Sequence, residues 1–147
     1  MRLFLRTTLL GLSILSRAFG AGDERVSAPK PVKNYAVSFF SDEGYPRVRV
    51  QGGSADLSDT AHIRLGEMAL TLYSGDADRT IDTVLIAPIA ILTPETEVVT
   101  GPATVRLERR DVTVQGEDWS YEHQERRIHI RRKAHVVFKT GLANILK

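Results

Sequence analysis

From residue 35 onward the chain consists of short runs in which apolar and polar residues alternate, and turn residues separate these runs. Residues 47–50 and 104–107 are two examples. An alternation of period two places apolar side chains on one face of a β-strand and polar side chains on the other. Roughly ten such runs, spaced a few residues apart, predict an all-β fold, a sandwich or barrel, over residues 35–139.

The positions of Gly, Pro, Asp and Ser predict where the strands end. We expect the glycine pair at 52–53 to form a bulge or bend. Pro88 should separate two strands, because proline cannot donate a hydrogen bond to a neighbouring strand. The expected turns lie at residues 41–44, 58–60, 74–78, 94–97, 116–118 and 122–125.

Residues 1–20 have the features of an export signal. Arg2 and Arg6 precede an apolar stretch at residues 9–15, and the small residues Ala18 and Gly20 suit cleavage after Gly20. The apolar stretch is shorter than the roughly 20 residues that span a bilayer. We therefore predict a signal peptide or, if the segment is retained, a short membrane anchor. A linker at residues 21–34 should follow it, and a tail at residues 140–147 should follow the β-domain.

Charge and cysteine content exclude several function classes. The chain has no cysteine, so it has neither a disulfide framework nor a thiol nucleophile. Its formal charge is +2, but residues 1–20 carry three arginines and no acid, so cleavage leaves −1. Because this charge gives little general attraction to nucleic acid, we predict no nucleic-acid partner.

Candidate metal ligands are sparse. His129 and His135 are six residues apart, and His129 shares a predicted strand face with Arg127 and Arg131, which would repel a cation. Zinc ligands are usually more closely spaced and are joined by a third ligand. We predict no metal and no cofactor.

Candidate catalytic groups are equally sparse. Carboxylates occur in pairs, such as Glu117 and Asp118, but these lie in predicted exposed turns, whereas a general acid needs a desolvated cleft. We predict that the protein is not an enzyme. A hydrolase built on Glu117, Asp118 and His123 remains an alternative.

Two sets of residues are candidates for binding. The basic run at 126–133 is either a rim for anionic head groups or a solvated strand face that protects a sheet edge. Its candidate rim residues are Arg127, Arg131, Arg132 and Lys133. The inward apolar residues either fill a closed interior or line a groove for acyl chains. The candidate groove residues are Val105, Leu107, Val112, Val114, Trp119, Tyr121, Ile128, Ile130, Val136 and Phe138.

The segment VSFFSDEGYPRVRV at residues 37–50 resembles the opening of the LptC family, the periplasmic component of the lipopolysaccharide-export machinery. The resemblance rests on the order and spacing of its motifs and extends over residues 35–138. Segments similar to the later hairpins of the family are residues 70–76, 86–92, 97–101, 104–107, 114–121, 128–130 and 136–138.

This resemblance implies an open antiparallel β-jellyroll with a V-shaped apolar groove. Such a module would bind lipopolysaccharide and pass it from an inner-membrane ABC transporter to the next jellyroll. Its partners would be the transporter permease and a periplasmic bridge jellyroll, joined by edge-strand addition. Its location would be the periplasm, either soluble or attached to the inner membrane. The short N-terminal segment departs from the family's anchor and leaves open a soluble relative closer to the bridge subunit. The alternative from another class is a structural or adhesion β-sandwich of the cell envelope that binds no lipid.

Overall fold

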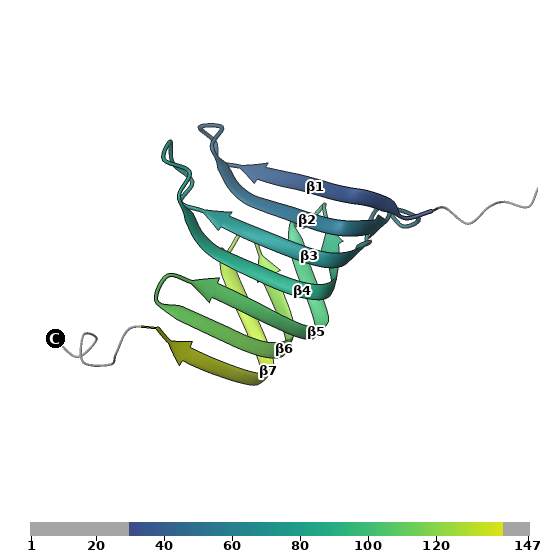
Figure 1. The fold of residues 1–147 in the computed structure, drawn as a ribbon. Helices are drawn as coiled ribbons and strands as arrows, with labels where there is room; N and C mark the ends of the chain where they lie inside the picture. Colours follow the sequence, from purple (N-terminus) through teal and green to yellow (C-terminus); the bar gives the residue numbers. More distant parts are fainter. Residues whose placement is uncertain (1–29, 140–147) are drawn as a thin grey trace, which may run out of the picture.

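The computed structural model describes residues 30–139, and within this range it contains seven strands and no helix. Each strand pairs antiparallel with the next one in the sequence, so the sheet has the order β1 to β7 (Figure 1). The predicted all-β, open antiparallel fold is confirmed. The strands are β1 (Val32–Phe40), β2 (Pro46–Asp56), β3 (Ile63–Tyr73), β4 (Ile81–Thr93), β5 (Val98–Arg109), β6 (Val112–Glu122) and β7 (Arg127–Phe138).

Several predicted boundaries are wrong, because seven long strands replace the roughly ten short ones. Pro88 lies inside β4, and the expected turn at residues 116–118 lies inside β6. Residues 32–34 of the expected linker already belong to β1. The predictions for residues 1–29 and for the tail at 140–147 lie outside the described residues. None of the described structure is a helix long and apolar enough to cross a membrane.

The interruptions that suggested turns are instead bends, and they line up across the sheet. The register places Gly53 opposite Glu67, and Glu67 opposite Pro88. In the same region, the backbone pairing of β4 with β5 and of β5 with β6 is interrupted. Residues with positive φ or a missing N–H interrupt a ladder and let the strand bend. We call this line the crease; its positions are Asn34, Gly53, Glu67, Pro88, Pro102, Asp118 and Lys133.

The crease folds the sheet back over itself, so that a second layer of strands lies behind the first (Figure 1). The first layer contains residues 35–52, 68–87, 104–117 and 134–138, and the second contains 54–66, 89–101 and 119–132. The ring of Phe39, on β1, stacks on the ring of His123, after β6, with centroids 5.4 Å apart. Side chains therefore connect β1 with the turn between β6 and β7.

The core fills the space between these two layers. The first layer contributes Val48, Val50, Met68, Leu70 and Leu85, each at most 1% exposed. The second layer contributes Leu65, Leu92, Val99, Trp119 and Tyr121, each at most 2% exposed. Since β1 and β7 each pair with only one strand, no ladder hydrogen bonds join the two layers beyond the crease.

Candidate functional site

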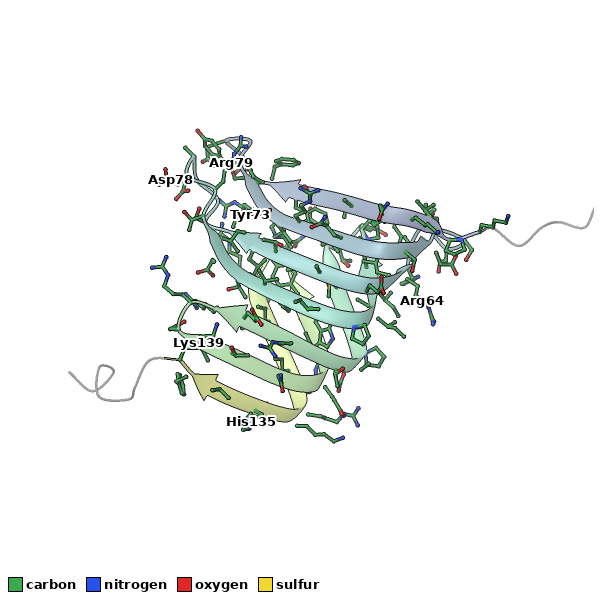
Figure 2. All side chains as sticks on the ribbon, in the orientation of Figure 1. Arg64, Tyr73, Asp78, Arg79, His135 and Lys139 are labelled. Carbon is green, nitrogen blue, oxygen red and sulfur yellow. The ribbon has the colours of Figure 1, made fainter. Side chains whose placement is uncertain are left out.

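A cavity of about 690 Å³ lies between the two layers on the side away from the crease. We call it the mouth. Its first-layer wall comes from the ends of β2, β3, β4 and β5 and from the turns that follow β3 and β5. Its second-layer wall comes from the end of β6 and the turn after it. In Figure 2, Tyr73 and Lys139 lie on this side of the molecule, opposite Arg64.

The floor of the mouth is part of the apolar core. Val48 and Tyr121 line the cavity and are 1% and 2% exposed, and the half-buried Leu72 packs against the same core cluster. The mouth therefore gives solvent a direct approach to the packed interior between the layers.

Tyr121 connects this floor to the rim. Its hydroxyl lies 3.1 Å from His123 Nδ1. Burial, together with the nearby charge of Glu97, raises the pKa of Tyr121 to about 12. The hydroxyl therefore stays protonated near neutral pH and can donate its hydrogen bond to His123.

We expect Tyr121 to make the stability of the protein depend on alkaline pH. Between pH 10 and 12 the unfolded chain loses the Tyr121 proton first, so the free energy of unfolding should fall by up to roughly 2–3 kcal/mol. Below pH 10 both states keep this proton, and the contribution is constant. Urea unfolding at pH 8, 10 and 11.5 measures the decline, which should be smaller in Tyr121→Phe. An unchanged slope in Tyr121→Phe would contradict the assignment.

The rim of the mouth carries more cations than acids. Four arginines line it, against two aspartates. Arg109 lies between both acids, with Nη2 3.5 Å from Asp82 Oδ1 and Nε 3.9 Å from Asp111 Oδ1. Within residues 30–139, the other three rim arginines have no carboxylate oxygen within 4.0 Å of their nitrogens. These three are Arg47, Arg110 and Arg126.

The ten predicted groove residues differ widely in exposure. Val105, Trp119 and Tyr121 are closed into the core at 2% exposure or less. Val136 and Phe138, on the edge strand β7, are about half exposed. The remaining five, which are intermediate in burial, are Leu107, Val112, Val114, Ile128 and Ile130.

The strand register connects these residues into continuous rows. Leu107 pairs with Val114, which pairs with Val136 on β7. In the second layer, Tyr121 pairs with Ile128, and Trp119 with Ile130. The space between the layers is therefore closed in the middle of the sheet and becomes more accessible toward β7. That the ten predicted groove residues bind lipid stays a prediction.

The four predicted rim residues lie on β7 and do not line the mouth. Each has an acidic neighbour within 4.0 Å: Arg127 contacts Glu125, Arg131 contacts Asp118, and both Arg132 and Lys133 contact Glu117. All four are more than half exposed. These contacts are typical of a solvated edge strand, where each ion pair contributes little to stability.

The residues of the hydrolase alternative are not brought together. Glu117 and Asp118 lie at the crease and contact Lys133 and Arg131, whereas His123 lies at the mouth. Among residues 30–139, no three His, Asp or Glu side chains are placed to hold a metal ion.

Sequence reasoning missed Arg47 and Arg110 as rim residues. A signal was present in the adjacent pair at 109–110, but nothing local connects that pair with Arg47 or Arg126. The chain matches no protein-family model, and no curated protein is similar to it in sequence. The resemblance to the LptC family therefore rests on the motifs alone.

Proposed function

We propose that this protein is a non-enzymatic periplasmic module that binds lipopolysaccharide and transfers it. It would receive the lipid from an inner-membrane ABC transporter and pass it to the next jellyroll. The observation that carries this proposal is the mouth: an apolar floor continuous with the core, approached from solvent between two layers.

The way the layers meet supports entry of an acyl chain. Beyond the crease they are held by side-chain packing and not by ladder hydrogen bonds. A chain can therefore enter between them without breaking backbone pairing. Each buried methylene stabilises the complex by about 0.8 kcal/mol, so a single acyl chain supplies a useful driving force.

The two sheet edges support the proposed partners. Among the strands of residues 30–139, β1 and β7 each have a neighbour on one side alone, which is the geometry that edge-strand addition requires. The cations along β7 would discourage indiscriminate pairing, because like charges on an edge oppose self-association. We propose the transporter permease and a bridge jellyroll as the partners at these edges.

One observation favours the alternative of a structural β-sandwich that binds no lipid. Trp119, Leu65, Leu70 and Leu85 are completely buried, so the centre of the core is already filled. A carrier must then take up its lipid at the mouth and toward β7, where burial is incomplete.

A charge placed in the floor of the mouth tests the carrier proposal. We expect Leu72→Glu to weaken binding of a fluorescent lipopolysaccharide by more than about tenfold, because an acyl chain would then face a carboxylate. The matched control is Ile86→Glu on the opposite face of the sheet, where the side chain is 49% exposed; binding should be unchanged.

Photo-crosslinking gives a second measurement that leaves the charge of the floor unaltered. A photoreactive residue at position 72 should capture lipopolysaccharide, and the same residue at position 86 should not. Equal capture at both positions, or wild-type binding by a folded Leu72→Glu variant, would contradict the carrier function.

A further inference from the structure

We propose that Arg47, Arg110 and Arg126 bind a phosphate group of the amphiphile whose chain enters the mouth. This inference rests on the proposed function and adds to it the chemistry and location of the head-group site. It places that site at the mouth, and not on the β7 residues that the sequence indicated.

The first argument is charge. These three arginines have no carboxylate within 4.0 Å among the described residues, while Arg109 beside them is shared by two aspartates. On β7, by contrast, each candidate cation already has an acidic neighbour. An incoming phosphate therefore competes with an acid in direct contact on β7, whereas no carboxylate of residues 30–139 lies within 4.0 Å of the three arginines of the mouth.

The second argument is placement. Arg47 and Arg110 belong to the first layer and Arg126 to the second, so a phosphate at the rim would be contacted from both sides of the opening. Guanidinium groups suit this ligand, because their planar N–H groups can bind two phosphate oxygens at once.

The third argument is that backbone contacts hold the three segments in position. The Arg126 N–H donates to the His123 carbonyl oxygen at 3.1 Å. The turn at Arg110 is tied to Lys139, whose backbone N–H donates to the Asp111 oxygen at 2.9 Å and whose Nζ donates to the Arg109 oxygen at 3.1 Å.

Arg47 lies along the turn after β3. At Gly75, where φ is +81°, a Cβ would sit only 3.3 Å from Arg47 Cγ and 3.5 Å from its Nε. The glycine thus leaves room for the Arg47 side chain to lie along the turn.

The arrangement also sets the orientation of the ligand. Val48, Leu72 and Tyr121 lie at the floor and the cations at the rim, so the amphiphile enters with its chain first and leaves its phosphate at the surface. Full desolvation of the phosphate, which would be costly, is thereby avoided.

Two amphiphiles with the same alkyl chain test this assignment on the full-length protein. We expect dodecyl phosphate to bind more than about tenfold tighter than dodecyl maltoside, measured by calorimetry below micelle-forming concentrations. The variant Arg47→Gln/Arg110→Gln/Arg126→Gln should bind both equally. The matched control, Arg127→Gln/Arg131→Gln/Lys133→Gln, makes the same change in charge on β7 and should keep the wild-type preference.

Three other kinds of result would contradict the head-group assignment, the kind of ligand or the carrier function. Equal binding of the two amphiphiles by the wild type, or the same loss in the β7 control, would overturn the head-group assignment and leave the carrier function standing. Displacement of dodecyl phosphate by an equal concentration of inorganic phosphate would show a site for the free anion and not for an amphiphile. If neither amphiphile binds, the carrier function fails together with the inference.

Discussion

Replacing Trp119 by alanine is expected to lower the free energy of unfolding by about 3–5 kcal/mol. Trp119 is the largest of the completely buried side chains, and it lies in β6 of the second layer against the core of the first. Its removal leaves a cavity that the rigid strands around it can fill only in part. Urea unfolding monitored by circular dichroism measures the loss.

The variant Trp119→Phe tests the cause of that loss. Within residues 30–139, Trp119 Nε1 is the one buried side-chain polar atom that has no hydrogen-bond partner. An unpaired buried N–H costs about 1–3 kcal/mol, so phenylalanine gives up packing but removes that penalty. We expect Trp119→Phe to destabilise by less than about 1.5 kcal/mol.

Phe40→Ala is the surface control for this pair of variants. Its ring is 59% exposed on the edge strand β1, so the change should cost less than about 1 kcal/mol. A loss from Trp119→Ala no larger than that of Phe40→Ala would contradict the placement of Trp119 in a packed core.

Gly101→Ala is expected to destabilise the protein by about 1–3 kcal/mol, although alanine is ordinarily more favourable than glycine inside a strand. Gly101 lies opposite Trp119 in the β5–β6 ladder. A Cβ at this position would overlap Trp119 Nε1 and come within 2.7 Å of Cε2 and 2.9 Å of Cζ2. The indole ring is fixed by the core on its other side, so it cannot give way.

The matched control is Gly53→Ala, also in a strand and also without positive φ. There the added Cβ would meet mainly the carboxylate end of Glu67, an exposed side chain that can rotate away. We expect its effect to stay below about 1 kcal/mol. Equal losses at the two glycines would show that the indole contact is not the cause.

A double-mutant cycle isolates the contact between Gly101 and Trp119. Phenylalanine lacks Nε1, the atom closest to the added methyl group. Gly101→Ala combined with Trp119→Phe should therefore lose about 1 kcal/mol less than the sum of the two single changes. Strict additivity would contradict a direct contact between the two residues.

The sequence alone was sufficient for the fold class and for most of the hairpin turns. The turns predicted at residues 41–44, 58–60, 74–78 and 94–97 fall between strands, and the one predicted at 122–125 begins at the last residue of β6. These signals are local, because glycine, proline and aspartate favour turns through their own backbone and side-chain preferences. The error at residues 116–118 came from the same rule, since a glycine and two acids also suit a bend inside a strand.

The crease could not be predicted in this way. Glu67, Asp118 and Lys133 have positive φ, yet glutamate and lysine have no particular preference for that region. Each such residue costs about 1 kcal/mol or more, which the packing of the two layers offsets. The tendency to bend is thus a property of neighbouring strands in register and not of any one segment.

The candidate site likewise combines features that the local sequence predicts with features that depend on the packing of the two layers. Alternation of period two is a property of consecutive residues, so strand formation and the side chains that share a strand face follow from the sequence. Which apolar residues are buried in the core, and which cations line the mouth, depends on how the two layers pack. Arg47, Arg110 and Arg126 come from separate turns and strand ends, and they line one cavity because the crease folds one layer over the other.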